Sequence, residues 1–254
     1  MAIEKPREIR VIRLAQVSKT YGKGDNAVHA LRNVSYVFPA GTFTAVMGPS
    51  GSGKSTFLHC AAGLDRPGSG SVMLGEVDLA TLGERRLTEL RRQRIGFVFQ
   101  AFNLIGSLSV RDNILLPPRL AGTRADRAWF DQVVAEVGLA DRLHHRPGEL
   151  SGGQQQRVAI ARALVTRPDV VFGDEPTGAL DTRTGAEVLA LLRAVVDQHR
   201  QTVIMVTHDP VAAAHADRVL FLADGQLVGH LDRPTPAEVA ARMTHLDDRR
   251  AARC

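Results

Sequence analysis

The stretch Gly48-Pro49-Ser50-Gly51-Ser52-Gly53-Lys54-Ser55-Thr56 fits the pattern G-x-x-x-x-G-K-[ST] of a phosphate-binding loop. Before it, residues 42–47 form a β-branched, apolar run that predicts a buried strand. After it, residues 55–62 predict a helix, and Gly63 suits the position just past its end. A strand, a glycine-rich loop and a helix in this order are the context that a phosphate-binding loop requires. The stretch therefore predicts an α/β fold organised around an anion site.

The residue types of this loop suit the phosphates of a nucleotide and a magnesium ion. Glycines allow a tight turn that aims several backbone N–H groups at one anion. The following helix presents its positive end to the same point. Lys54 supplies an ammonium group for the β- and γ-phosphates, and the Ser55 hydroxyl can ligate Mg²⁺. A glycine/serine-rich loop with a chance lysine is the alternative, which the flanking strand and helix disfavour.

The composition bounds the class of protein. The chain has 254 residues, of which 44% are hydrophobic, so it can bury a large core. Its net charge of +5 suits anionic nucleotides, acidic lipids or nucleic acid alike and discriminates poorly among them. Aromatic residues make up 5% of the chain and do not interleave with basic ones as in proteins that stack single strands. We therefore expect no nucleic-acid partner.

The cysteines and the hydropathy pattern indicate the compartment. Cys60 falls in the helix after the phosphate loop and suits a small core position, and Cys254 is the last residue. Two such cysteines indicate no disulfide framework, and a reducing cytoplasm is the expected compartment. Residues 1–13 are charged and contain no apolar signal region. Because no run approaches the ~18 apolar residues of a spanning helix, we expect a chain that needs a partner for any membrane role.

Short strands flank the phosphate-loop strand and a helical segment follows. Residues 9–17 and 30–38 predict the strands of a small antiparallel sheet, with a loop at residues 19–25, and residues 71–74 and 77–79 predict two short strands around a turn at Gly75. Residues 84–94 predict an arginine-rich helix, whose alternatives are a solvated face with i,i+4 pairs and a contact with anionic lipid. Residues 95–99 predict a buried strand. From residue 101 to residue 150 the predicted elements are helices, at residues 110–116, 124–137 and around Asp141.

Strands and helices alternate again from Ser151. Helices are predicted at residues 151–164, 185–198 and 211–216, and strands at 169–172, 202–206, 218–222 and 227–230. This alternation predicts a mostly parallel sheet. We expect one domain over residues 1–254, with an α/β core and its antiparallel β-subdomain in 1–100 and 151–231, a helical subdomain in 101–150 and a tail, partly helical, in 232–254.

Two carboxylates end a predicted strand. Asp169-Val170-Val171-Phe172-Gly173-Asp174-Glu175 is an apolar strand whose tip carries Asp174, followed by Glu175. Parallel strands place their carboxyl ends at one edge, so Asp174 can reach Mg²⁺ at the phosphate loop. Glu175 could polarise the water that attacks the γ-phosphate. A turn with two solvated acids is the alternative.

A second predicted anion site begins at Ser151. In Leu150-Ser151-Gly152-Gly153-Gln154-Gln155-Gln156-Arg157, Ser151 is a good N-cap residue and two glycines expose the backbone N–H groups. A generic helix start explains the serine and one glycine, but it does not explain the glycine pair followed by three glutamines.

Together these motifs resemble the ATP-binding cassette (ABC) family of ATPases over the chain to about residue 231. Leu150 to Gln154 resemble the family's signature motif, and residues 171–177 its second nucleotide motif. Four further features match family elements: Ala179-Leu180-Asp181 the dimer-contacting loop, Gln100 the glutamine loop, His208 the switch histidine, and Tyr21 the aromatic that stacks on adenine. For His208 and Tyr21 the alternatives are a strand-end histidine and a plain surface aromatic.

The resemblance implies a P-loop NTPase core, ATP and Mg²⁺ as cofactors, and a role for each matched residue. Lys54 and the loop amides hold the phosphates. Ser55, Gln100 and Asp174 serve Mg²⁺, Glu175 is the catalytic base, and His208 contacts the γ-phosphate. The family packs two domains head to tail, so that the signature of one caps ATP on the loop of the other. One loop and one signature in this chain imply a homodimer. Gly173 departs from the family, where a bulkier residue or alanine is expected.

Further stretches resemble the lipoprotein-release and macrolide-efflux branch of the family. They are residues 97–104, 109–114 and 146–149. This resemblance implies an integral membrane permease as partner, and a position at the cytoplasmic face of the membrane. Phe102, Leu104, Ile105 and Leu108 would offer the permease an apolar groove, unless they belong to the core. A regulatory ABC ATPase that moves no solute, and a soluble one of the iron–sulfur assembly type, are the alternative functions.

Overall fold

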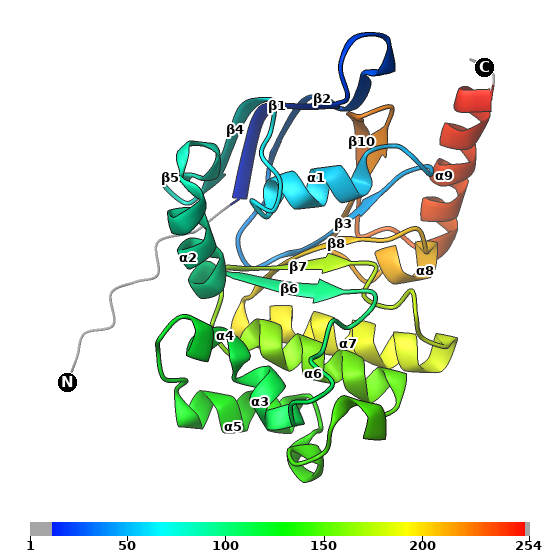
Figure 1. Cartoon of the computed structure of the whole chain (residues 1–254). Helices are drawn as coiled ribbons and strands as arrows, with labels where there is room; N and C mark the ends of the chain where they lie inside the picture. The colour runs from blue at the N-terminus through cyan, green and yellow to red at the C-terminus, as the bar shows by residue number, and fades with distance from the viewer. Residues whose placement is uncertain (1–11, 252–254) are drawn as a thin grey trace.

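The computed structural model describes residues 12–251, and its centre is a six-stranded sheet (Figure 1). The strand order is β10-β9-β3-β8-β7-β6. The strands are β3 (Phe43–Met47), β6 (Ile95–Phe99), β7 (Val170–Asp174), β8 (Thr202–Val206), β9 (Arg218–Ala223) and β10 (Gln226–Asp232). All neighbours pair in parallel except β9 and β10. The predicted mostly parallel sheet is therefore confirmed.

A second, antiparallel sheet has the order β2-β1-β4-β5. Its strands are β1 (Ile12–Tyr21), β2 (Val28–Val37), β4 (Ser69–Leu74) and β5 (Val77–Asp78). The sequence placed residues 19–21 in a loop, which is wrong, because β1 continues through Tyr21 by pairing with Val28 across a short 3₁₀ turn (Gly24–Asn26). Residues 9–11 of the predicted first strand lie outside the described residues.

Helices cover both faces of the central sheet. α1 (Lys54–Ala61) and the antiparallel sheet pack on one face, and α6 (Gly152–Leu164) and α7 (Thr182–His199) on the other (Figure 1). β3 shows why: all five of its residues are buried, with Phe43, Ala45 and Met47 in one hydrophobic cluster and Val46 in the other. A strand buried on both faces requires such a continuous apolar run. Cys60 is buried on the α1 side, and burial raises the pKa of its thiol to about 11.

Short helices fill the region between β6 and α6. They are α3 (Val110–Ile114), α4 (Leu116–Leu120) and α5 (Arg127–Glu136), with 3₁₀ turns at Ala140–Arg142 and Pro147–Glu149. The sequence predicted one helix over residues 110–116 and missed α4, whose first turn contains Pro117. Proline is tolerated there because the first N–H groups of a helix have no intrahelical partner. The division of the chain into subdomains stays a prediction.

The tail forms a helix that packs back on the core. α9 (Pro236–Ala251) buries Val239 and Leu246 in the same cluster as Ala212 and Ala213 of α8 (Pro210–Ala213). The predicted helical tail therefore exists as far as Ala251, and residues 252–254 lie outside the described part. Among residues 12–251, no helix combines the length and the apolar character needed to cross a bilayer.

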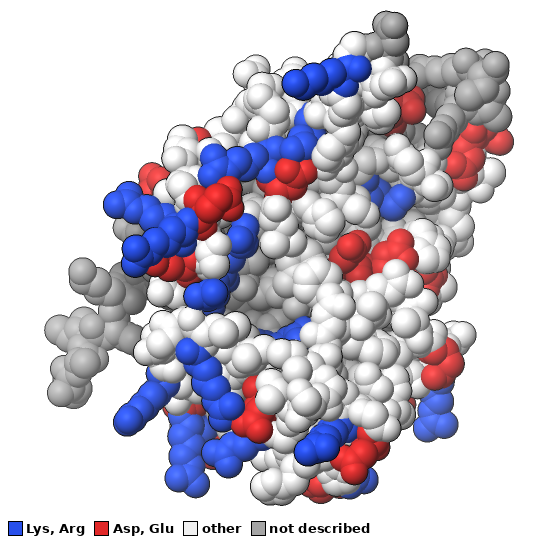
Figure 2. Space-filling model, viewed as in Figure 1, with Lys and Arg blue, Asp and Glu red and all other residues white. Residues whose placement is uncertain are grey.

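Arginines crowd α2 (Glu84–Arg94), and Figure 2 shows basic side chains gathered on this side of the molecule. Several of them bond to the protein itself. Arg85 pairs with Glu89 at i,i+4, Arg92 donates to the Leu120 carbonyl, and Arg94 pairs with Asp169 at 2.5 Å. These contacts favour the interpretation of α2 as a solvated face with i,i+4 pairs.

Candidate functional site

Strand register brings the predicted catalytic loops to one edge of the sheet. Val46 of β3 pairs with Val206 of β8, Val206 pairs with Asp174 of β7, and Asp174 pairs with Phe99 of β6. Each of these strands ends within one residue of this row. The segments that leave the edge carry the phosphate loop, Gln100, Glu175 and His208.

The phosphate loop is as tight as its glycines predict. A Cβ on Gly48 would lie 2.0 Å from the Leu222 carbonyl oxygen, and one on Gly53 would lie 2.2 Å from that of Ala30. Gly51 and Gly53 have φ of 74° and 99°, in the region that favours glycine. The loop therefore has no room for a side chain at Gly48 or Gly53.

Polar side chains in the loop fit an anion. Lys54 Nζ donates to the carbonyls of Gly48 and Pro49 at 2.8 and 3.0 Å, so the ammonium closes over the loop. Burial lowers the pKa of Lys54, and the carboxylates of Glu175 and Asp174 oppose that shift. The Ser52 hydroxyl is buried and has no hydrogen-bond partner within the described residues. Ser50 and Ser55 are exposed and Pro49 is buried.

The two carboxylates have different surroundings. Asp174 is half-buried, and desolvation raises the pKa of its carboxyl group. Glu175 has a left-handed backbone with φ of 47°, and its N–H donates to the Val206 carbonyl at 2.9 Å. His208 Nδ1 lies 3.0 Å from Glu175 Oε2. The structure thus joins two residues that the sequence placed on separate strands.

Gln100 and the signature segment lie beside the loop after β7. Gln100 is exposed, and its Nε2 would be 2.8 Å from a Cβ on Gly178. Gly152 faces Leu180 and Phe102, and a Cβ on Gly153 would lie 2.1 Å from Thr184 Cγ2. The described neighbours of Gly152 and Gly153 are therefore the segment after Gln100, the loop after β7 and the start of α7, and none of them belongs to the phosphate loop.

Side chains at the starts of α6 and α7 accept hydrogen bonds from backbone N–H groups of the first helical turn. Ser151 Oγ accepts from the Gln154 N–H at 3.3 Å, and Gln154 Oε1 accepts from the Ser151 N–H at 3.0 Å. Asp181 Oδ1 accepts from the Thr184 N–H at 3.0 Å. These bonds fix both helix starts.

Tyr21 belongs to a cluster that the sequence did not predict. Its hydroxyl donates to Asp65 Oδ2 at 2.6 Å, and Lys19 Nζ donates to Asp65 Oδ1 at 2.6 Å. Burial raises the pKa of Tyr21, and the Asp65 hydrogen bond adds to it. Tyr21 is 43% exposed, and Lys19 Nζ lies over its ring, 5.1 Å from the ring centroid. Tyr21 and Asp65 are 44 residues apart, and no sequence pattern connects them.

The residues predicted for Mg²⁺ are one hydroxyl, one amide and one carboxylate: Ser55, Gln100 and Asp174. Among the described residues there is no group of three or more His, Cys, Asp or Glu side chains that could hold a metal alone. Mg²⁺ in nucleotide sites uses one or two carboxylates and takes its other ligands from phosphates and water. The single carboxylate of Asp174, together with the Ser55 hydroxyl and the Gln100 amide, fits a magnesium ion of this kind.

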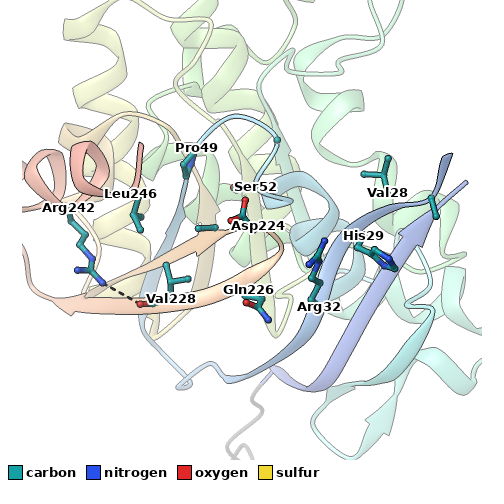
Figure 3. A pocket seen from close by; sticks show the side chains of 13 residues that line it. Val28, His29, Arg32, Pro49, Ser52, Asp224, Gln226, Val228, Arg242 and Leu246 are labelled. Atoms are coloured by element: carbon teal, nitrogen blue, oxygen red, sulfur yellow. Dashed lines mark hydrogen bonds between the residues drawn. The ribbon is translucent and has the colours of Figure 1, made fainter. Parts of the chain in front are cut away.

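A separate cavity of about 680 Å³ lies behind the phosphate loop (Figure 3). Pro49, Gly51 and Ser52 line it together with Arg242 and Leu246 of α9. Arg242 donates to the Val228 carbonyl at 3.3 Å. Lys54 and the two carboxylates are not among its described lining residues, so the cavity is not the centre of the predicted chemistry.

Comparison with known proteins identifies relatives. A profile of the ABC transporter family matches residues 31–178. The macrolide export ATP-binding/permease protein MacB of Neisseria meningitidis serogroup B is 44% identical over 220 residues, which are 86% of this chain and 34% of MacB. MacB 1/2 of Paracoccus denitrificans is 46% identical over 232 residues, with 91% and 34% covered. The chain thus spans about a third of the length of these relatives.

Another relative and two solved structures match over nearly their whole length. An uncharacterized ABC transporter ATP-binding protein of Thermotoga maritima is 44% identical over 222 residues, covering 87% of this chain and 94% of that protein. The dimeric, post-hydrolysis cassette MJ0796 bound to ADP and Pi has a TM-score of 0.79 at 39% identity, covering 88% and 99%. CbiO1 of Clostridium perfringens, part of the transporter complex cbiONQ, has a TM-score of 0.79 at 27% identity, covering 92% of each chain.

Proposed function

This chain belongs to the ABC transporter family, and from that premise we propose that it is the ATP-hydrolysing subunit that drives a separate integral membrane permease. One observation carries the proposal. The phosphate loop, Asp174 and the Glu175–His208 pair share one edge of the sheet, where a nucleotide can meet a base and a positive charge.

Each of the predicted site residues has a separate role in ATP hydrolysis. Ser55, Gln100 and Asp174 would hold Mg²⁺, which when bound neutralises phosphate charge. Lys54 exchanges its bonds to the loop carbonyls for phosphate oxygens. Glu175 accepts a proton as water attacks the γ-phosphorus and the bond to the leaving ADP oxygen breaks. His208, 3.0 Å from Glu175, orients that carboxylate and donates to the γ-phosphate.

We infer a head-to-tail homodimer from the position of the signature. At the start of α6, Ser151 is exposed and Gly152 and Gln154 are half-exposed, whereas Gly153 is buried, and the described neighbours of Gly152 and Gly153 do not include the phosphate loop. A second copy placed in the opposite direction brings its signature to that loop and, by symmetry, creates two composite sites. The MJ0796 cassette, which matches over 88% of this chain, is dimeric with ADP and Pi bound.

The permease contact is proposed at the region after Gln100. Ile105 is 43% exposed there, whereas Leu104 packs against the buried cluster, so the exposed apolar surface is smaller than the sequence suggested. A groove of about 260 Å³ lies beside it, lined by Phe97, Phe99 and Pro117 among others. The MacB relatives are named ATP-binding/permease proteins. A membrane permease bound at this region would hold the chain at the cytoplasmic face of the membrane.

The test is Glu175→Gln. Removing the base should lower steady-state phosphate release by about 10²–10⁴-fold, because that is the usual contribution of a general base. ATP binding should persist, and ATP should trap a dimer that light scattering detects. Lys54→Ala is the comparison variant and should weaken ATP binding itself. Phosphate release by Glu175→Gln at the unmodified rate, or no dimer with ATP, would refute the proposal.

A further inference from the structure

Two polar side chains of α6 reach loops of the nucleotide edge. Gln156 is fully buried, and its Nε2 donates to the Pro176 carbonyl at 2.5 Å and, at 3.4 Å, to the Phe99 carbonyl. Pro176 follows Glu175, and Phe99 precedes Gln100. One side chain therefore holds both loops to the signature helix. Its Oε1 is buried without a partner in the described part of the chain, and a buried polar atom left unpaired is costly unless the position serves a purpose.

Arg162, six residues further along α6 than Gln156, holds the segment after Gln100. Its guanidinium donates to the carbonyls of Phe102 and Asn103 at 2.9 and 2.5 Å. Both of these residues have left-handed backbones, with φ of 58° and 51°. Non-glycine residues keep this conformation when their surroundings impose it. Burial lowers the pKa of Arg162, so the site is unfavourable to a charge, and the two carbonyls compensate.

The same segment touches the start of α6. Phe102 Cζ would lie 3.7 Å from a Cβ on Gly152, and Leu180 Cδ2 would lie 3.4 Å from it. The loop that carries Gln100 is therefore in contact with the signature at Gly152 and is bonded to α6 again at Arg162.

We propose that Gln156 and Arg162 are positioning residues that make α6 a rigid connection between two nucleotide sites. On one side of this connection are Gln100 and Glu175, which follow strands that end at the same sheet edge as the strand before the phosphate loop. On the other side is the signature, which faces the partner's ATP in the head-to-tail dimer, so this inference rests on the proposed function. ATP on a chain's own loop then moves the signature that the chain offers to its partner.

The test uses the Glu175→Gln protein as parent, so that bound ATP persists. Arg162→Met and Gln156→Met remove the bonds to the two loops, and Arg162→Lys keeps the charge. Arg157→Met is the matched control, because Arg157 also lies on α6 but bonds to Glu187 and to the Val137 carbonyl. Two properties are measured: the affinity of the dilute monomer for a fluorescent ATP analogue, and the ATP concentration at half-maximal dimer formation.

We expect monomer affinity to stay within about twofold in Arg162→Met and Gln156→Met. The ATP concentration for dimer formation should rise about tenfold, which corresponds to the loss of roughly one hydrogen bond. Arg162→Lys should be intermediate and Arg157→Met should match the parent. A third measurement needs no dimer: ATP should slow hydrogen exchange at residues 150–156 of the monomeric parent, and this effect should vanish in Arg162→Met.

Three results would overturn the inference. Arg162→Met and Gln156→Met could dimerise at the parent's ATP concentration. Arg157→Met could lose dimer formation equally, which would indicate a general role of α6 in stability. Monomer affinity could fall as much as dimer formation does. If Arg162→Met does not fold, Gln156→Met and Arg162→Lys decide by the same comparison. A parent that forms no dimer refutes the head-to-tail function, and hydrogen exchange then decides the coupling.

Discussion

Gly173 shows, at the scale of one residue, how a departure from the family pattern is accommodated. It occupies β7 just before Asp174, where alanine or a bulkier residue was expected. A Cβ here would meet Pro176 Cγ at 3.4 Å and Met205 Cγ at 3.7 Å, which are ordinary van der Waals distances. The end of β7 therefore lacks one side chain, and Asp174 and Glu175 still follow it at the sheet edge.

Gly173→Ala should therefore stabilise the protein by about 0.5–1 kcal/mol, because glycine in a strand interior loses more conformational entropy on folding than alanine. Urea unfolding measures the change. Gly48→Ala is the contrasting variant, since its Cβ would collide with the Leu222 carbonyl, and it should lose both stability and ATP binding. A less stable Gly173→Ala would show that the contact with Pro176 is repulsive.

At the scale of elements, α9 is a tail helix that reaches the phosphate loop. Its buried residues Val239 and Leu246 join the cluster of α6 and α7, and Leu246 also lines the cavity behind Pro49. The Asp247 carboxylate is close enough to act against the desolvation that lowers the pKa of Lys54. The tail is thus part of the loop's electrostatic surroundings, although no motif in its sequence connects it to a nucleotide.

Leu246→Asp should detach the end of α9, because a carboxylate in this apolar contact costs on the order of 2–4 kcal/mol. We expect rapid proteolysis within residues 232–251 and faster hydrogen exchange in α9, with the central sheet still protected. Ala241→Asp, on the exposed side of the helix, is the matched control and should change little. Equal protection of α9 in both variants would contradict the packing described here.

At the scale of the whole molecule, the antiparallel sheet has no core of its own. Ile12 of β1 and Phe38, which directly follows β2, share one cluster with Val46 and Phe172 of the central sheet. The Phe38 ring also lies 4.8 Å from that of Tyr36 and 6.1 Å from that of Phe57, centroid to centroid. Two sheets that bury a common core should unfold together.

Phe38→Ala should lower the free energy of unfolding by about 3–5 kcal/mol while a single transition remains. Circular dichroism and tryptophan fluorescence should report the same midpoint, since Trp129 lies in α5, far along the chain from the substitution. Val37→Ala, at a side chain 53% exposed, is the control and should cost little. Two separate transitions in Phe38→Ala would show that the antiparallel sheet folds independently.

Local patterns in the sequence were sufficient for most of the fold. The phosphate loop with its strand and helix follows from the spacing of glycines, Lys54 and apolar residues over a few turns of chain. The alternation of strands and helices predicted the parallel sheet, and the parallel direction predicted that Asp174 shares an edge with the loop. Errors arose where neighbours outweighed local preference, as in the continuation of β1 through Tyr21 and in α4 with its prolines.

The phosphate-loop stretch, Gly48 to Thr56, was therefore determined by sequence alone, because nearby residues set its backbone conformation and hydrogen bonds. Only the tertiary structure decided what surrounds it. Tyr21 meets Asp65 across 44 residues, and Arg162 meets Phe102 across 60. Such pairs form when packing of the whole chain brings distant segments together, and a backbone carbonyl as acceptor leaves no trace in the sequence. The hydrogen bonds that join the signature helix to the segment after Gln100 are contacts between such distant segments.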